Sequence, residues 1–249
     1  MTSRPQAART RKPPGERRAE ILHTAARIAL DEGLERITLR RVADELGVRP
    51  GLIGHYFPAA DDLVSEAFAH AAVQERDVLL PPGANEADRS PTARLAGFLV
   101  RLTGSDCLDL SRLWLNARHL SRFKPGLRAT VREQESLTRS ALTGLVEDGV
   151  RRGEFRTGDP LGAALHILVT VDGLGAYAND HTDHTDGTDG TDADADHTDH
   201  TDGTDAATDG DSSDSKGDDV DHPALQDLAL TVAEHRLGLT PGLLRAAAI

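Results

Sequence analysis

Apolar residues along most of this chain recur at intervals of three and four positions, the spacing that gathers them on one face of an α-helix. The clearest example is a short stripe formed by Leu39, Val42, Ala43 and Leu46. Thr38 can cap the start of this helix, and Gly47 gives the backbone the freedom for a sharp turn after it. Pro50 suits the first turn of a second short helix, which Ile53 and Phe57 can pin to a core. The pattern therefore predicts two short helices joined by a tight turn.

The same spacing predicts further helices on both sides of this pair, separated by Gly and Pro residues. They are expected at about 16–33, from 61 or 62 onward, and at about 95–102, 107–120, 127–152, 160–178 and 224–237. The alternation with a period of two that marks a half-buried strand is not convincing anywhere. Aromatic residues make up only 3% of the chain, whereas Ala and Leu are frequent. The predicted fold class is all-α.

A tract between the last two expected helices, residues 179–221, contains 16 Asp, one Lys and almost no large apolar residue. Such a segment cannot bury enough apolar surface to offset its ordering entropy, so a disordered insert is predicted. It also accounts for the net charge of −13, because the rest of the chain sums to +2 and residues 1–18 alone to +5. The basic charge therefore lies next to the predicted helix pair, where phosphates would be met.

Three other observations bear on where in the cell the protein is expected to be. Cys107 is the single cysteine, so an intramolecular disulfide is impossible. No apolar run approaches the ~20 residues that would span a bilayer. The Arg-rich N-terminus has no apolar segment after it, which argues against a secretory signal. A cytoplasmic protein without a membrane partner is expected.

Residues 38–57 have the layout of a helix-turn-helix, which presents its second helix to the major groove of DNA. With the all-helical remainder, they resemble the TetR family of transcriptional repressors, and residues 51–57 are most similar to its betaine-regulator (BetI-like) branch. Matching motifs follow in the order expected for that branch: Trp114-Leu115, Pro125-Gly126-Leu127-Arg128, Arg152-Gly153-Glu154-Phe155, Asp159-Pro160 and Val171-Asp172-Gly173-Leu174. The chain departs from the family at Gly54, where an aromatic residue is common, and at Pro58 and Ala60, where lysines are common.

This resemblance implies a division of the chain into parts. Residues 1–15 are expected to be a flexible basic arm, and 16–76 a DNA-binding domain. Residues 77–178 together with 222–240 are expected to bind a ligand and to form the dimer. The insert at 179–221 is foreign to the family pattern. Small residues in the last two helices favour close helix approach and a four-helix dimer interface: Gly162, Ala163, Ala164, Gly173 and Gly175.

The second helix of the pair and the start of the first supply the expected contacts to DNA. Arg49 can donate two hydrogen bonds to guanine, and Leu52 can contact a thymine methyl group. Thr38 and Arg41 can hold phosphates. The full expected set is Thr38, Arg41, Arg49, Pro50, Gly51, Leu52, His55 and Tyr56. The alternative is that these are only solvated residues on small helices.

Effector contacts are expected in the C-terminal part of the chain. The candidates are Trp114, Asn116, Arg118, His119, Phe123, Phe155 and Asp172. Each can equally be a core or surface residue. An aromatic cage for choline or betaine is not expected, because aromatic residues are scarce.

The leading interpretation is a dimeric repressor that a small molecule releases from a palindromic operator. An enzyme is not expected, because neither a nucleophile with its base, nor a phosphate-binding glycine loop, nor a cysteine metal site is apparent. No cofactor and no built-in metal site are expected. The alternative is a metal-binding or metal-sensing protein that acts through the insert, where His181 and His184, and again His197 and His200, are three residues apart.

Overall fold

The computed structural model describes residues 12–81, 89–104, 108–182 and 222–248, and every regular element in these ranges is helical. The all-α prediction is confirmed. The elements are α1 (Pro14–Glu32), the 3-10 helix η1 (Leu34–Arg36), α2 (Leu39–Leu46), α3 (Pro50–Tyr56), α4 (Ala60–Leu79), α6 (Pro91–Leu102), α7 (Leu108–Leu120), α8 (Pro125–Arg151), α9 (Pro160–Thr182), α10 (His222–Leu237) and α11 (Leu243–Ala247).

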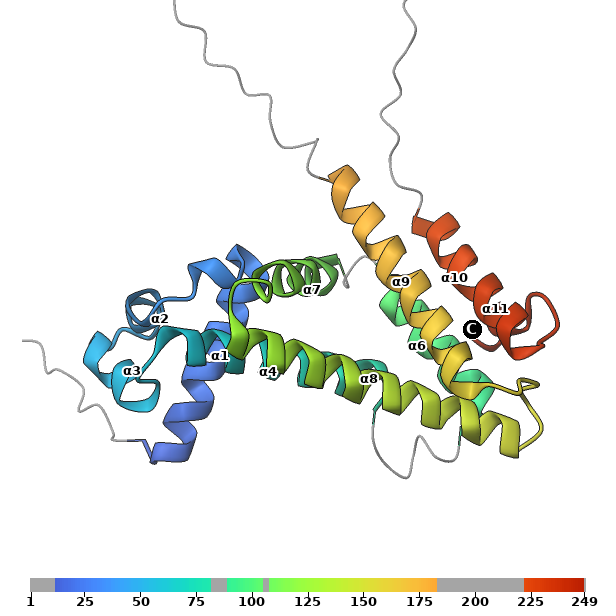
Figure 1. The fold of residues 1–249 in the computed structure, drawn as a ribbon, viewed down its shortest axis with the longest axis horizontal. Helices are drawn as coiled ribbons and strands as arrows, with labels where there is room; N and C mark the ends of the chain where they lie inside the picture. The colour runs from blue at the N-terminus through green and yellow to red at the C-terminus, as the bar shows by residue number, and fades with distance from the viewer. Residues whose placement is uncertain (1–11, 82–88, 105–107, 183–221, 249) are drawn as a thin grey trace, which may run out of the picture.

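Two apolar clusters lie at opposite ends of the molecule, and two long helices join them (Figure 1). The first cluster gathers the buried faces of α1 to α4, α7 and the start of α8. The second gathers α6, α9, α10, α11, the end of α4 and the second half of α8. With 27 residues, α8 extends about 40 Å and packs along α4. Because α4 and α8 contribute residues to both clusters, these two helices connect the two ends of the molecule.

The structure differs from the sequence-based expectation most clearly in the length of α9 and in an additional helix, α11. The helix expected to stop near residue 178 continues to Thr182, where the Asn179 side chain donates a hydrogen bond to the Gly175 carbonyl at 2.8 Å. The first four residues of the predicted insert are therefore helical, and the remainder, 183–221, lies outside the described residues. The structure also adds α11, which the sequence pattern did not predict.

A buried carboxylate explains α11. Glu234 on α10 accepts hydrogen bonds from the backbone N–H groups of Gly242 at 2.9 Å and Leu244 at 2.8 Å. Leu244 itself is fully buried in the second cluster. Because the capping group comes from eight to ten residues upstream, periodicity within 243–247 carries no sign of it.

Candidate nucleic-acid interface and ligand cavity

The helix pair α2 and α3 forms as the sequence predicts, and each local cause is visible. The Thr38 hydroxyl oxygen accepts the Arg41 N–H at 3.0 Å and caps α2. Gly47 ends α2 in the left-handed region with φ of 59°, and Pro50 is the first residue of α3. Ile53 and Phe57 are completely buried, and they hold the seven-residue α3 against the first cluster.

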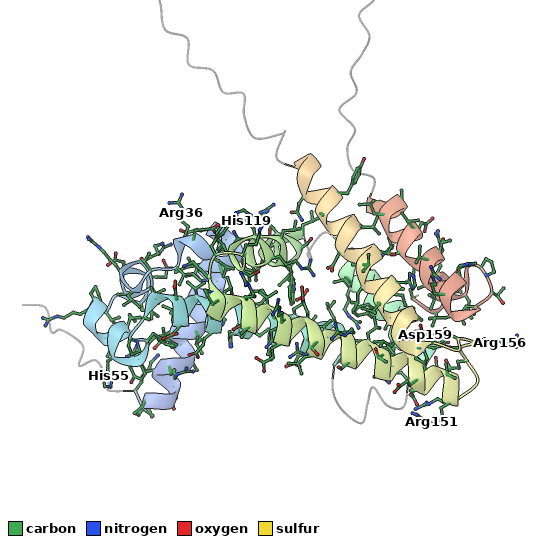
Figure 2. The ribbon with its side chains drawn as sticks, viewed as in Figure 1. Arg36, His55, His119, Arg151, Arg156 and Asp159 are labelled. Atoms are coloured by element: carbon green, nitrogen blue, oxygen red, sulfur yellow. The ribbon has the colours of Figure 1, made fainter. Side chains whose placement is uncertain are left out.

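The outer face of α3 is free to meet a partner. Arg49, Pro50, Gly51 and His55 are exposed, while Leu52 and Tyr56 are half-buried. Figure 2 shows His55 pointing away from the body of the molecule, and its ring meets Tyr56 edge to face at 5.3 Å between centroids. Thr38 and Arg41 lie at the start of α2, so all eight residues expected to contact DNA belong to one end of the molecule.

Arg41 is held by two carboxylates. Its guanidinium lies 2.5 Å from Glu32 and 2.7 Å from Glu45, and Glu45 also pairs with Arg27. The hydrogen bonds that Arg41 donates to Glu32 and Glu45 raise the pKa of Arg41 above its ordinary value, and those that Glu45 accepts from Arg41 and Arg27 lower the pKa of Glu45. A phosphate that binds Arg41 must therefore compete with carboxylates already in place.

The described start of the basic arm lies beside α3. Lys12 and Arg17 both pair with Glu20, at 2.8 and 2.6 Å. Together they line a shallow hollow whose other wall includes Arg49 and Leu52. Residues 1–11, which make up most of the expected basic arm, lie outside the described part of the chain.

A cavity of about 280 Å³ lies between α4, α6, α7, α8 and α9. Much of its wall is apolar: Leu79, Leu80, Phe98, Leu102, Leu115, Leu165, Leu168, Val169 and Val171. Its polar wall contains Glu75, Arg76, Ser111, Trp114, Arg118, Glu135, Thr138, Arg139 and Asp172. An apolar pocket with a few convergent polar groups is the usual form of a small-molecule site.

The structure divides the expected effector residues into two groups. Trp114, Arg118 and Asp172 line the cavity. Asn116, His119, Phe123 and Phe155 do not line it. His119 lies on the outer side of α7 and meets Phe123, which is 72% exposed (Figure 2). Phe155 is buried against Gly149 in the second cluster, and Asn116 contacts η1.

Glu75 is the functional candidate that sequence reasoning missed. Its Oε2 accepts the indole N–H of Trp114 at 2.6 Å, and burial raises the pKa of Glu75 to about 7. Asp172 adds to this effect, whereas the Trp114 hydrogen bond, Arg76 and Arg118 oppose it. Glu75 stands in a polar stretch of α4, so only the approach of α7 distinguishes it from an ordinary surface carboxylate.

Arg118 joins three helices at the polar wall. It donates to Glu135 on α8 at 2.9 Å and to Asp172 on α9 at 2.8 Å. Its guanidinium also lies over the Trp114 ring, 5.5 Å from the centroid. Although burial opposes its charge, Asp172 and Glu135 hold the pKa of Arg118 above its ordinary value.

The surface of α9 and α10 carries exposed apolar residues. On α9 they are spaced four or eight residues apart and follow a stripe that is inclined to the helix axis: Leu161, Leu165, Val169 and Tyr177. Leu228 on α10 is also 48% exposed. Of the small residues expected at a dimer interface, Ala163 and Ala164 are buried in the chain's own core and Gly175 faces Ser111, whereas Gly173 is exposed.

The composition of α9 also bears on the expectation that no segment spans a membrane. Pro160–Asn179 is long and apolar enough to cross a membrane by length and composition, with a mean hydropathy of 1.4, which the sequence analysis did not anticipate. Only 28% of that window is buried. Small and apolar residues on several faces raise the mean, while Asp172 interrupts any continuous run.

The metal expectation concerns residues that are mostly outside the described ranges. His184, His197 and His200 fall in 183–221, and the placement of the His181 side chain is likewise not described. Within the described ranges, no group of three or more His, Cys, Asp or Glu residues is arranged to hold a metal ion.

Two family models match the chain. "Bacterial regulatory proteins, tetR family" matches residues 21–67, and "Tetracyclin repressor-like, C-terminal domain" matches residues 88–175. Among curated proteins, the chain is 38% identical over 53 residues to the HTH-type transcriptional repressor KstR2 of Mycolicibacterium smegmatis, a match that covers 21% of this chain and 26% of that repressor. The chain thus matches about a quarter of that relative's length.

Solved structures with the same fold cover far more of the molecule. A TetR-family transcriptional regulator from Rhodococcus sp. aligns with a TM-score of 0.58 at 23% identity, over 66% of this chain and 88% of that one. GusR of Salmonella enterica aligns with a TM-score of 0.60 at 13% identity, over 91% of this chain and 98% of that one. At these identities the likeness concerns the fold.

Proposed function

Because the chain belongs to the TetR family of bacterial regulatory proteins, we propose that it is a homodimeric transcriptional repressor in the cytoplasm, bound to a palindromic operator and released by a small molecule. The observation that carries the DNA-binding part is the exposed face of α3, fixed in place by the buried side chains of Ile53 and Phe57. A short helix held in this way after a tight turn can enter a major groove without loss of structure.

Residues of α3 supply the proposed sequence readout. Arg49 reaches a guanine edge, Leu52 a thymine methyl group, and His55 with Tyr56 base edges or phosphate. Thr38 retains a hydroxyl proton that it can donate to a phosphate, since its oxygen accepts the Arg41 N–H. Residues 51–57, which carry the narrower resemblance to the betaine-regulator branch, are on this same helix, and that placement assigns no effector.

The exposed stripe on α9, with Leu228 of α10, supports the dimer. Apolar side chains with this much exposure gain free energy when a second copy covers them. A two-fold axis through these helices gives two copies of α3 the same orientation toward DNA. Half-sites about one helical turn apart, roughly 34–36 Å, are then expected.

The cavity supports regulation by a ligand. Helix α7 carries Trp114 and Arg118 on its cavity face and Asn116 on its other face, where it contacts η1 of the DNA-binding end. A ligand that moves α7 can therefore alter the position of α2 and α3, provided it binds the two arrangements with different affinity. The alternative of metal sensing through 183–221 has no supporting observation among the described residues.

Selection of bound sequences from a random DNA pool tests the proposal, with the recovered site then titrated against salt. A palindrome with half-sites one turn apart and a steep salt dependence is expected. Arg49→Ala is the matched variant, and it should lose preference at the half-site guanine while keeping non-specific binding. Recovery of no common sequence by the dimer would contradict the proposal.

A further inference from the structure

The cavity is divided into an apolar region and a charged region, which sets the shape of what it can hold. Leucine, valine and phenylalanine side chains from α4, α6 and α9 form the apolar part. The charged part is formed where α4, α7, α8 and α9 meet, around Glu75, Trp114 and Asp172. An occupant that satisfies both parts has a hydrocarbon body and one polar end.

Glu75 is the charged group at this polar end with the fewest hydrogen-bond partners. Among the described residues, the Trp114 indole is the one polar partner that donates to its carboxylate, and it binds Oε2 at 2.6 Å. Glu75 lines the cavity and is half-buried, so its second oxygen, Oε1, can accept a hydrogen bond from a bound molecule. A desolvated carboxylate without a cation in contact is unfavourable, and a cationic ligand removes that penalty.

The surroundings of Glu75 already accept a positive charge. The Arg118 guanidinium lies between Glu135 and Asp172 and over the Trp114 ring. One arginine is thus shared by two carboxylates, and Glu75 adds a third close by. Formal charges on the cavity wall balance, with three carboxylates and the three arginines Arg76, Arg118 and Arg139, but among the described residues no ion pair joins Glu75 to any of them.

The arginines of the cavity wall favour an anionic ligand, but this argument is weaker than the one for a cation. Arg118 is engaged by both of its carboxylate partners. Arg76 donates to the Gln134 side chain at 3.1 Å, and Arg139 lies 3.4 Å from the Ser136 hydroxyl. A ligand carboxylate would have to draw one of these away and would also lie near Glu75, Glu135 and Asp172, which repel it.

We propose that the cavity binds a cationic amphiphile, with its hydrocarbon body among the apolar side chains and its ammonium group against Glu75 and Trp114. This proposal deepens the proposed function and rests on it in one respect: the ligand is an effector only if the protein is a DNA-binding regulator. The ammonium group donates a hydrogen bond to Oε1 of Glu75, and the hydrocarbon body needs no hydrogen-bond partner. A quaternary ammonium fits the same position through charge alone.

Proton release accompanies this binding. Burial raises the pKa of Glu75 to about 7, so part of the ligand-free protein carries a neutral Glu75 at pH 7. A cation selects the ionised form and expels the proton. The charged groups that act on Glu75 are Asp172 on α9, Arg118 on α7 and Arg76 on its own helix, and Glu135 and Arg139 of α8 line the same cavity.

The experiment compares octylamine, 1-octanol and octanoate, which share a hydrocarbon body and differ in charge. Trp114 is the chain's single tryptophan, so its fluorescence reports occupation of this cavity in the full-length protein. Octylamine is expected to bind at least tenfold more tightly than 1-octanol at pH 8, and octanoate less tightly than 1-octanol. Below pH 7, octylamine affinity should fall by up to about tenfold per pH unit while 1-octanol affinity stays constant.

Glu75→Gln should lower octylamine affinity at least tenfold, abolish its pH dependence and leave 1-octanol affinity within about threefold. Asp77→Asn, an exposed carboxylate change on the same helix, should alter none of these values. If Glu75→Gln does not fold, the pH profile of the unaltered protein decides. Tighter binding of octanoate, or an octylamine affinity that is flat from pH 5.5 to 8, would overturn the proposal.

The DNA selection separates the two claims. A protein that selects an operator but binds the three probes equally contradicts the cationic ligand and leaves the regulator intact. A protein that prefers octylamine but selects no operator contradicts the regulator and leaves the ligand class standing.

Discussion

Asn116 on α7 holds Glu35 on η1 with both carboxylate oxygens 2.8 Å from its side-chain nitrogen. Its oxygen also accepts the Leu34 N–H at 3.0 Å. These contacts join the helix that carries Trp114 and Arg118 to the segment directly before α2. They form a direct polar link from the cavity helix to the helix pair.

Asn116→Ala should therefore weaken the communication between cavity and operator. Octylamine is expected to bind as before, and operator affinity to change by a few-fold at most, while the factor by which octylamine alters operator affinity moves toward one. Operator titrations with and without saturating octylamine measure that factor. Arg112→Ala, at an exposed position on the same helix that pairs with Asp109, is the control. An unchanged factor in Asn116→Ala would assign the communication to another contact.

The carboxylates around Arg41 should limit its contribution to DNA binding. Replacing both Glu32 and Glu45 by Gln removes the competition for the guanidinium. Operator affinity is expected to rise a few-fold at low salt, and the slope of log affinity against log salt to steepen by about one unit. Stability should change little, because these ion pairs are exposed to solvent.

The matched control for this change is the same double variant with Arg41→Ala added, in which the gain should disappear. If the gain persists without Arg41, the relevant cation is Arg27, which also pairs with Glu45.

The exposed apolar residues of α9 and α10 should determine oligomeric state. Leu161→Asp and Leu228→Asp are each expected to convert the dimer to monomer at micromolar concentration, because a charge would be buried at the interface. Sedimentation velocity measures the state, and circular dichroism confirms that the helices remain. Val78→Asp, at a still more exposed apolar position on α4, should leave the dimer unchanged. Dimers that survive both changes would place the interface elsewhere.

Burial of Glu75 should make the ligand-free protein less stable as pH rises. The folded state holds the proton up to about pH 7, whereas the unfolded chain releases it near 4.5. The folded state therefore binds more protons between these values, so the stabilising contribution is complete below the lower pKa and is lost as pH rises through the higher one. The shift is equivalent to about 3 kcal/mol. Glu75→Gln should remove this loss and be the more stable protein at pH 8.

The measurement is urea unfolding of the protein and the variant at intervals from pH 5 to 8. His70 contributes in the opposite sense, because burial and the nearby His23 lower its pKa and stability falls as pH drops. Taking the difference between variant and unaltered protein at each pH cancels the His70 contribution. A difference that does not grow between pH 5 and 8 would contradict a buried, protonated Glu75.

The sequence predicts those features of the structure that depend on residues close together in the chain, and it misses those that depend on distant residues. The Thr38 cap, the Gly47 turn and the anchors of α3 act within a few residues, so local pattern finds them. Glu75 escapes notice because its partner Trp114 is 39 residues away.

The placement of Asn116 was, in contrast, open to sequence reasoning. Ser111, Trp114, Leu115 and Arg118 recur at helical spacing and form the cavity face of α7. Asn116 lies two residues after Trp114, on the opposite side of the helix. Treating Trp114 and Asn116 as members of one site overlooked that geometry.

Gly149 and Gly144 on α8 should respond oppositely to the same change. A Cβ at Gly149 would lie 2.1 Å from the Phe155 ring, whereas at Gly144 it would meet nothing within 4 Å. Alanine normally stabilises a helix interior by about 1 kcal/mol relative to glycine. Gly144→Ala should show that gain, and Gly149→Ala should lose about 1–3 kcal/mol, because the ring is buried and cannot move away. Urea midpoints measure both, and Gly149→Ala with Phe155→Leu should recover part of the loss if the ring is its cause.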